Sequence, residues 1–191
     1  MKPFNKIYSG LDTEAALKEL NENAHLFGEF NARKEAGPIH SDMDDIWLRY
    51  GDISGMNESG DYSKIAEEHD SIWLQRLPEC RKLCFDVMAL TNGERLGGVL
   101  ITKLPHGGKI LPHEDSGWHA EYYSKVFVPI RNETGAVFGF GNDAIVPEIG
   151  DAWMFDNSVN HWVVNNSKSP RIAMIICVKQ SKFKENGQLQ R

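Results

Sequence analysis

Residues 98–113 read GVLITKLPHGGKILPH and decide which fold to expect. Two short apolar segments flank Gly107-Gly108, a turn signal, so this stretch predicts a pair of strands. The pattern continues along the chain, where turns rich in Gly, Asn and Asp separate further apolar segments. The expected strands are residues 98–104, 109–113, 124–130, 136–140, 152–155, 161–165 and 171–179. A series of short strands with regular turns is typical of a double-sheet jelly roll.

The part of the chain before these strands is polar and mainly helical or irregular. One helix is expected to begin at Asp12-Thr13-Glu14, because acidic residues favour the positive end of a helix, and to end near Gly28. A second begins at Pro78 and ends at Asn92-Gly93, with apolar residues at helical spacing between them. A short strand is expected at residues 45–50, and residues 56–71 are interpreted as a surface loop or partial helix.

These elements predict one domain, residues 1–191, of the mainly β class with flanking helices (α+β). Residues 1–94 are expected to form a helical and irregular part whose helices pack on one sheet. Residues 95–180 are expected to form the β core, which carries the functional site, and residues 181–191 a polar C-terminal tail. A chain of 191 residues is long enough to bury one sizeable hydrophobic core.

Charge and composition argue against several classes of function. The formal net charge is −6, the pI is about 5.6, and no basic stripe is present, so nucleic-acid binding is not expected. No apolar run approaches the roughly 20 residues that span a bilayer, so no membrane association is expected. The N-terminus has no apolar signal segment, and we expect a cytoplasmic protein. The three cysteines, Cys80, Cys84 and Cys177, are expected to be buried free thiols.

The most informative polar residues are His113, Asp115 and His161. Residues two apart on a strand share a face, so His113 and Asp115 can point together while Glu114 turns away. His161 begins a later strand and can approach from the other sheet. Each residue alone has an ordinary structural interpretation, since a single His-x-Asp arises often by chance. Together they form the 2-His-1-carboxylate set of non-haem Fe(II) oxygenases, which leaves coordination positions open.

Arg171 begins the almost wholly apolar segment RIAMIICV, residues 171–178. A lone arginine there lies either at the solvent-exposed end of the strand or against a buried anion, because an unpaired buried charge is costly. A guanidinium binds a carboxylate through two contacts, so Arg171 suits a dicarboxylate co-substrate such as 2-oxoglutarate.

Two stretches, Thr102–His113 and Gly150–His161, together with the spacing from His161 to Arg171, resemble the aspartyl/asparaginyl β-hydroxylase family of Fe(II)/2-oxoglutarate-dependent dioxygenases. The resemblance covers residues 102–178 and implies a double-stranded β-helix, the cupin-like form of the jelly roll. It also implies that His113 and His161 bind Fe(II), that O2 is a co-substrate, and that Arg171 binds the distal carboxylate of 2-oxoglutarate with help from Thr102.

Two departures from the family pattern limit what is carried over. The animal members have glycine where this chain has Asp115, so a full facial triad looks more like the bacterial members and free-amino-acid hydroxylases. The family often has Arg-x-His where this chain has Lys125-Val126-Phe127. Lys125 is expected to keep the cationic role toward 2-oxoglutarate, whereas Phe127 cannot donate a hydrogen bond, so the partner of the 1-carboxylate is left open.

The tetratricopeptide-like region of the animal enzymes has no counterpart in this sequence, so a small amino-acid-like or carboxylate substrate is expected. The candidate substrate contacts are Trp118, Arg49 and His119. The aromatic residues Trp118, Trp153, Trp162, Phe127 and Phe155 are expected to form the walls of the site. His40-Ser41-Asp42 lies outside the β core and is interpreted as a chance likeness to a metal motif.

Three other functions compete with this interpretation. A peptide aspartyl/asparaginyl hydroxylase would use the same core on a different substrate. A non-catalytic cupin-like metal-binding protein would need His113, Asp115 and His161, but neither Arg171 nor Thr102. A zinc hydrolase would need a general-base carboxylate near the metal, and Glu114 is expected on the wrong face. The sequence does not decide the oligomeric state.

Overall fold

The structure, a computed structural model, describes residues 4–51, 68–70 and 75–180. It contains two antiparallel sheets, one of seven strands and one of four. In spatial order, the larger sheet consists of β1 (Phe4–Tyr8), β9 (Ala152–Phe155), β6 (Ser124–Arg131), β11 (Arg171–Gln180), β4 (Gly93–Leu104), β2 (Asp44–Gly51) and β3 (Glu68–Asp70). The smaller sheet consists of β5 (Lys109–His113), β10 (His161–Asn165), β7 (Ala136–Phe140) and β8 (Asp143–Ile145).

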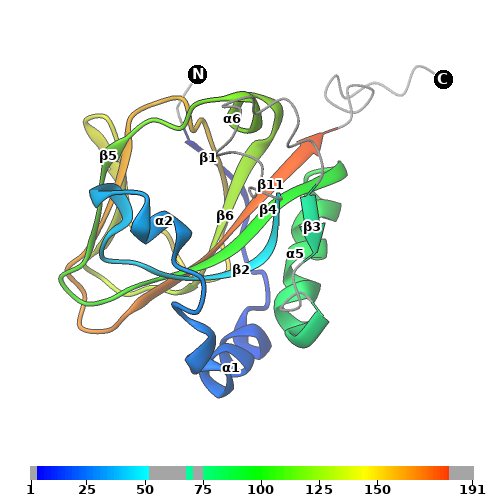
Figure 1. The fold of residues 1–191 in the computed structure, drawn as a ribbon, viewed down its shortest axis with the longest axis horizontal. Helices are drawn as coiled ribbons and strands as arrows, with labels where there is room; N and C mark the ends of the chain where they lie inside the picture. The colour runs from blue at the N-terminus through cyan, green and yellow to red at the C-terminus, as the bar shows by residue number, and fades with distance from the viewer. Residues whose placement is uncertain (1–3, 52–67, 71–74, 181–191) are drawn as a thin grey trace.

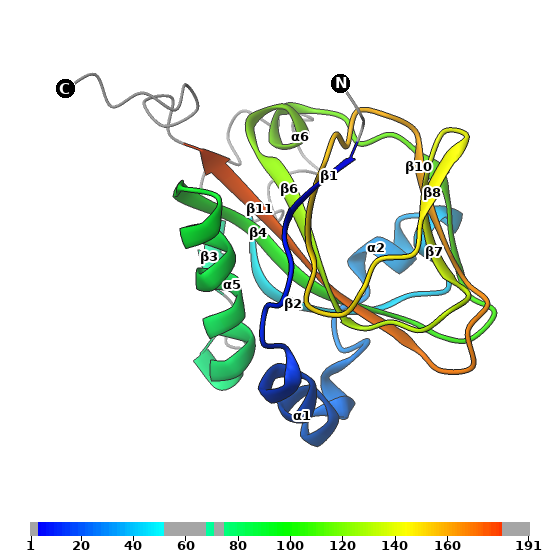
Figure 2. The same ribbon diagram turned by 180° about the vertical axis from the view of Figure 1, so that it is seen from behind.

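Two longer helices pack against the larger sheet, and several short helical elements lie in the connections between strands. Helices α1 (Glu14–Glu22) and α5 (Pro78–Leu90) lie on one side of the larger sheet, and the smaller sheet lies on its other side (Figures 1 and 2). Short elements α2 (Ala32–Glu35) and the 3-10 helix η2 (Pro38–His40) precede β2, while α6 (Trp118–Tyr122) follows β5. This is the predicted jelly roll with helices packed on one sheet.

Strand β11 lies between β6 and β4, and both of its faces are buried because helices cover one side of the larger sheet and the smaller sheet covers the other. Ile172, Met174 and Ile176 point to the core shared with α1 and α5. Arg171 and Ile175 alternate with them and face the space between the two sheets. Burial of both faces explains why the strand is apolar almost throughout. Arg171, a charged residue that faces the space between the sheets, therefore needs a separate explanation.

Two apolar cores hold the layers together. The first packs residues of α1 and α5, including Leu20, Leu83 and Cys80, against one face of the larger sheet. The second fills part of the space between the sheets with Phe127, Phe138, Phe140 and Phe155, together with Met43 from the chain before β2. The cavity described below opens beside this second core.

The structure confirms every strand predicted between residues 98 and 179, and the helix at Pro78–Leu90. Strands β1 and β8 were not predicted, and β8 begins at Asp143, in an expected turn. Helix α1 ends at Glu22, before the predicted Gly28, because the chain tightens into a 3-10 turn at Ala24–Leu26. Within the expected loop at residues 56–71, only residues 68–70 are described, and they form β3.

The predicted state of the three cysteines is confirmed, since Cys80, Cys84 and Cys177 are buried and unpaired by disulfides. In the part of the chain that the structure describes, no helix has the length and apolar character needed to cross a membrane.

One buried asparagine fixes the turn that leads into Arg171. The Asn165 side chain is fully buried, and its Nδ2 donates hydrogen bonds to the carbonyls of Leu104 (3.0 Å), Pro105 (3.0 Å) and Ser169 (2.9 Å). Its Oδ1 accepts hydrogen bonds from the Ser167 amide and hydroxyl. Because Leu104 pairs with Arg171 across the sheet, this network sets where β4 ends and β11 begins.

Replacing Asn165 by alanine is expected to lower the free energy of unfolding by roughly 2–4 kcal/mol, because several buried polar groups lose their partners together. Urea unfolding followed by circular dichroism measures this change. Asn166→Ala is the matched control, since Asn166 is exposed on the same turn. Equal unfolding midpoints for the two variants would contradict the assigned role of Asn165.

Candidate active site

His113, Asp115 and His161 come together at one end of the space between the sheets. Their ligand atoms all lie within 4.8 Å of one another. The Asp115 carboxylate lies between the two rings, with Oδ1 3.8 Å from His113 Nε2 and Oδ2 3.9 Å from His161 Nε2. Two imidazole nitrogens and a carboxylate that converge in this way match the ligand set of non-haem Fe(II) sites.

The orientation of both imidazoles is fixed by the backbone. His113 Nδ1 lies 2.8 Å from the Leu111 carbonyl, and His161 Nδ1 lies 2.9 Å from the Val159 carbonyl. A carbonyl can only accept, so each Nδ1 carries the proton and each Nε2 keeps a lone pair that faces the other ligands. Supporting contacts of this kind are common around metal-binding histidines, so both rings have an orientation in which they could hold a metal.

Three different segments bring the ligands to this place. His113 ends β5 and pairs directly with His161, the first residue of β10. Asp115 lies just beyond β5, in the loop before α6, and is held there because its amide donates to the Asn157 carbonyl at 2.9 Å. Strand alternation predicts that His113 and Asp115 point the same way, and because Asp115 lies beyond the end of β5, this loop contact also fixes its direction.

Charges around the cluster favour the protonation states that bind a metal. The Lys125 ammonium donates a hydrogen bond to Asp115 Oδ2. Burial alone would raise the pKa of Asp115, but the Lys125 cation outweighs it and holds that pKa below its ordinary value. Burial lowers the pKa of His161. An ionised carboxylate and a neutral imidazole result, which are the forms that coordinate metal ions.

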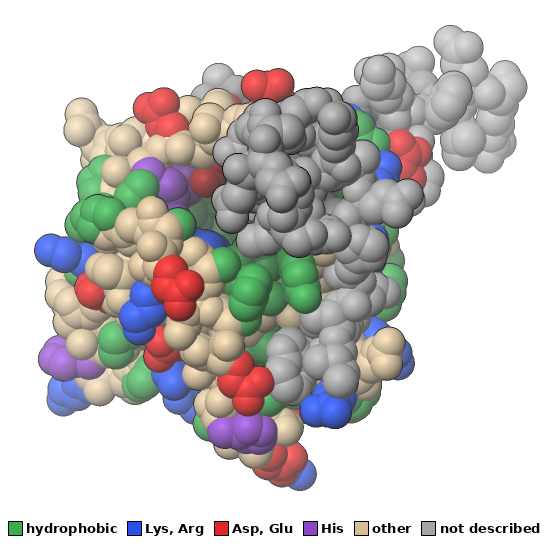
Figure 3. Space-filling model, viewed as in Figure 1, with side chains coloured by type: hydrophobic (Ala, Val, Ile, Leu, Met, Phe, Trp, Pro, Cys, Tyr) green, Lys and Arg blue, Asp and Glu red, His purple; other side chains and the backbone are tan. Residues whose placement is uncertain are grey.

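The cluster lines a cavity of about 340 Å³ between the two sheets. Its wall also contains Arg171, Thr102, Lys125 and His119, so four more of the predicted site residues line the same space. On the face shown in Figure 3, a hollow with histidine and acidic side chains lies beside exposed hydrophobic side chains. The volume lies within the range of about 300–1,000 Å³ that is usual for small-molecule sites.

Arg171 is the most unusual residue of this wall. It is only 2% exposed, its Nε has no hydrogen-bond partner, and no carboxylate among the described residues pairs with it. Burial lowers its pKa to about 10, so the side chain remains cationic at neutral pH. Thr102 lies on the neighbouring strand β4, and its hydroxyl donates to the Ala173 carbonyl at 3.4 Å. A buried guanidinium without an anion fits a carboxylate that enters the cavity.

The structure does not bring Arg49 to the cavity wall. A register shift in the pairing of β2 with β4 falls between Trp47 and Arg49, so simple alternation fails there. As a result Trp47 and Tyr50 line the cavity, whereas Arg49 Nε donates to the Leu96 carbonyl at 3.3 Å. Trp118 is the first residue of α6, and its side chain lies outside the described part of the chain.

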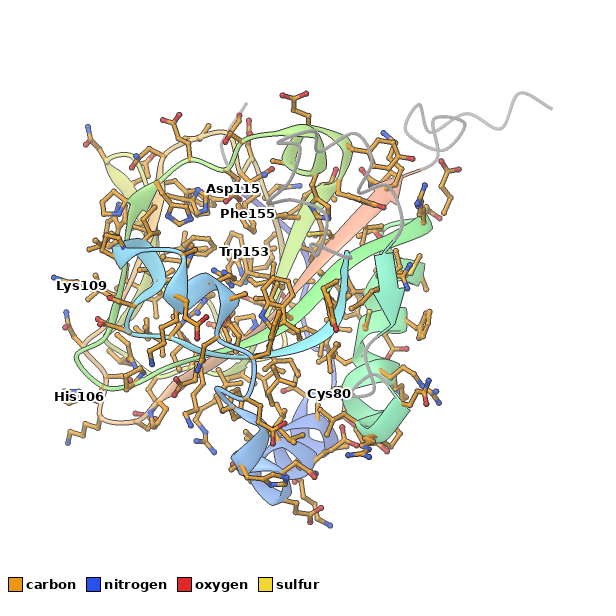
Figure 4. All side chains as sticks on the ribbon, in the orientation of Figure 1. Cys80, His106, Lys109, Asp115, Trp153 and Phe155 are labelled. Carbon is orange, nitrogen blue, oxygen red and sulfur yellow. The ribbon has the colours of Figure 1, made fainter. Side chains whose placement is uncertain are left out.

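The predicted aromatic walls are only partly present. Phe155 lines the cavity and its ring lies 5.5 Å from that of His161, between centroids. Figure 4 labels Asp115, Phe155 and Trp153 in the interior between the sheets, far from Cys80 on α5. Phe127 is fully buried beneath the wall, in the second core. Trp162 was wrongly placed, because it lies on the opposite face of β10 from His161 and covers Gly139.

Two functional candidates, Arg33 and His40, were missed by the sequence analysis. Both line the cavity. The rings of His40 and His113 lie 4.9 Å apart in an edge contact. Among the described residues, His40-Ser41-Asp42 is not part of the possible metal-binding group, so its likeness to a metal motif is a chance one, as predicted. Asp42 instead accepts a hydrogen bond from the Lys109 amide and holds this segment against β5. The sequence around Arg33 and His40 has no periodicity that predicts where they lie. The only signal for a functional role is that an arginine, a histidine and an aspartate occur close together within residues 33–42.

The fold is supported by comparisons with solved structures. A prolyl hydroxylase from Trichoplax adhaerens, solved with a hypoxia inducible factor peptide, is 12% identical and has a TM-score of 0.57, covering 97% of this chain and 86% of that one. A 2OG-Fe(II) oxygenase family protein from Burkholderia pseudomallei is 14% identical, with a TM-score of 0.53 and coverage of 91% and 92%. A viral collagen prolyl hydroxylase from Paramecium Bursaria Chlorella virus-1, solved with 2OG, is 10% identical, with a TM-score of 0.52 and coverage of 95% and 97%.

No curated protein matches the chain. The family model described as aspartyl/asparaginyl beta-hydroxylase matches residues 21–181, most of the sequence. Its match agrees with the ligand cluster and the buried arginine, which fit Fe(II) and 2-oxoglutarate. The chain therefore belongs to the aspartyl/asparaginyl β-hydroxylase family and is a hydroxylase of the Fe(II)/2-oxoglutarate oxygenase type.

Proposed function

We propose that His113, Asp115 and His161 bind Fe(II), and that Arg171 and Thr102 hold the distal carboxylate of 2-oxoglutarate. The proposal is carried by one observation: the ligand cluster and an unpaired buried guanidinium line the same cavity. An arginine buried without a partner costs stability, so its presence favours a bound anion. A dicarboxylic acid can place one end at Arg171 and the other toward the metal.

Bound Fe(II), 2-oxoglutarate and O2 supply the oxidant that hydroxylates an unactivated C–H bond, with succinate and CO2 as co-products. The chain's own residues supply orientation and a dry cavity. The Leu111 and Val159 carbonyls hold the two imidazoles, and Lys125 holds the carboxylate of Asp115. Lys125 is thereby placed as a support for Asp115, in addition to the contact with 2-oxoglutarate suggested by the sequence.

The substrate we propose is a small amino-acid-like or other carboxylate-bearing molecule. Among the described residues, the charged side chains of the cavity wall are the cations Arg33, Lys125 and Arg171 and the anion Asp115. Asp45, which is not part of the wall, pairs with Arg33. Fe(II) adds two positive charges and 2-oxoglutarate brings two negative ones. One positive charge then remains unmatched, which favours a substrate with one carboxylate.

Incubation with Fe(II), 2-oxoglutarate and O2 tests the substrate class. Separate reactions contain free amino acids or peptides with aspartate and asparagine, and mass spectrometry reads the gain of one oxygen against succinate release. We expect free amino acids to be hydroxylated. Hydroxylation of peptides alone would favour the second candidate, a peptide aspartyl/asparaginyl hydroxylase. The family match and the peptide in the structure of the Trichoplax enzyme support this candidate.

A second measurement separates a hydroxylase from a non-catalytic cupin-like protein. Anaerobic addition of 2-oxoglutarate to the Fe(II)-loaded protein is expected to produce a weak visible charge-transfer band, the sign of a chelated keto acid. Metal binding without this band, and without succinate formation in air, would contradict the proposed function.

A further inference from the structure

Helix α2 and the chain that joins it to β2 form a wall of the cavity that neither sheet supplies. Figure 1 shows α2 in front of the space between β5 and β2. This segment is firmly attached, since Met43 is buried in the core between the sheets and Asp42 accepts the Lys109 amide hydrogen bond at 3.0 Å. Its inward-facing polar residues are Arg33 and His40.

Arg33 has hydrogen-bonding capacity that the described part of the protein does not use. Its Nη1 lies 3.5 Å from Asp45 Oδ2, which is an ion pair at the limit of hydrogen-bond distance. No other described residue pairs with its guanidinium, which carries five N–H donors. The Arg33 side chain is 25% exposed, whereas Arg171 is 2% exposed. The cavity therefore has two guanidiniums at different depths, and the inner one suits 2-oxoglutarate.

An aromatic surface on strand β2 lines the same cavity as Arg33. Trp47 and Tyr50 both line the cavity, and their ring centroids are 6.2 Å apart. Phe30, which is 37% exposed, lies 6.0 Å from Trp47 and 5.6 Å from Tyr50. Three rings in mutual contact give a rigid apolar surface that loses little conformational entropy on binding.

We propose that Arg33 binds the carboxylate of the acceptor substrate, and that Trp47 and Tyr50 contact its apolar body. The acceptor substrate is accordingly an amphipathic monocarboxylate, which rests on the proposed function and narrows its substrate class. His40, which lines the same cavity and whose ring contacts that of His113, supplies a further polar contact near the carboxylate. Arg33 thus selects the substrate, while Arg171 selects the co-substrate.

Binding of a matched pair of probes tests this proposal. The Ni(II)- and 2-oxoglutarate-loaded protein, which does not turn over, is titrated by calorimetry with 3-phenylpropanoate and with 3-phenylpropan-1-ol. The two probes differ only in the carboxylate. We expect the acid to bind at least about tenfold more tightly than the alcohol, a difference of roughly 1.4 kcal/mol. Arg33→Gln is expected to remove this preference and to leave the affinities for 2-oxoglutarate and the alcohol unchanged.

Lys34→Gln is the matched control. Lys34 is the next residue on α2 and pairs with Asp44 at 3.0 Å, so this variant also loses one cation and one ion pair. Lys34 is not part of the cavity wall, and its variant is expected to keep the preference for the acid. Arg33→Lys, which keeps the charge but loses the two-contact geometry, is expected to give an intermediate preference and serves if Arg33→Gln does not fold.

Equal binding of acid and alcohol to the wild-type protein would overturn the proposal, and so would equal effects of Arg33→Gln and Lys34→Gln. Failure of the proposed function would give a different result. In that case the Ni(II)-loaded protein would not bind 2-oxoglutarate but would still bind the acid in a way that depends on Arg33.

Discussion

Replacing His113 or His161 by alanine is expected to abolish metal-dependent succinate formation. Each variant removes one of three converging ligands, and the remaining pair cannot hold the metal on one face. We expect metal affinity to fall by more than the roughly 10–100-fold that follows loss of a supporting outer contact. Anaerobic titration with Mn(II) or Co(II) measures this loss without any need for turnover.

The fold should survive both substitutions, because both rings line the cavity and their removal leaves the backbone pairing of β5 with β10 in place. His25→Ala is the control, since His25 is exposed on the 3-10 turn after α1. Near-native succinate formation by either variant in excess Fe(II) would show that the replaced histidine is not a ligand.

Arg171→Met is expected to raise the apparent constant for 2-oxoglutarate at least about thirtyfold. Loss of a charged two-contact interaction in a desolvated site costs on the order of 2–5 kcal/mol, and about 1.4 kcal/mol corresponds to a factor of ten. The dependence of succinate formation on 2-oxoglutarate concentration gives the constant, and metal titration should change little.

Arg171→Met should weaken 2-oxoglutarate binding without lowering the thermal stability of the protein. Because Arg171 has no anionic partner among the described residues, its replacement by an apolar side chain of similar length should leave the thermal midpoint unchanged or raise it. Arg131→Met, on the neighbouring strand β6, is the control, since Arg131 bonds Asn21 outside the cavity. An unaltered 2-oxoglutarate constant in Arg171→Met would assign Arg171 a structural role only.

The sequence predicts the β core well because most of its strands carry their own signal. The segment RIAMIICV has to be buried, and the turns at Gly107-Gly108 and Asn132–Gly135 separate strands clearly. Strand β1 has no such signal, since FNKIY is short and its pairing with β9 links residues far apart in the sequence. Strand β8, only Asp143–Ile145, is too short to produce a periodic pattern.

The candidate site shows the same division. His113, Asp115, His161 and Arg171 could be found because their residue types and strand positions restrict their roles. Arg49 was misplaced because alternation fails at a register shift that only strand pairing reveals. His40 was dismissed because its contact with His113 depends on how an irregular segment packs against β5, and local sequence does not encode such packing directly.

The wall that carries Arg33 comes from a different part of the chain than the metal ligands, and this matters for inhibitor design. Compounds that chelate the metal and imitate 2-oxoglutarate address features that follow from the shared fold, and such compounds would inhibit many oxygenases alike. Arg33 and His40 belong to the segment that precedes β2, not to the strands that carry the ligands. A chelator extended by a carboxylate toward Arg33 and an aromatic group toward Trp47 would gain its selectivity from contacts that a differently connected oxygenase does not offer.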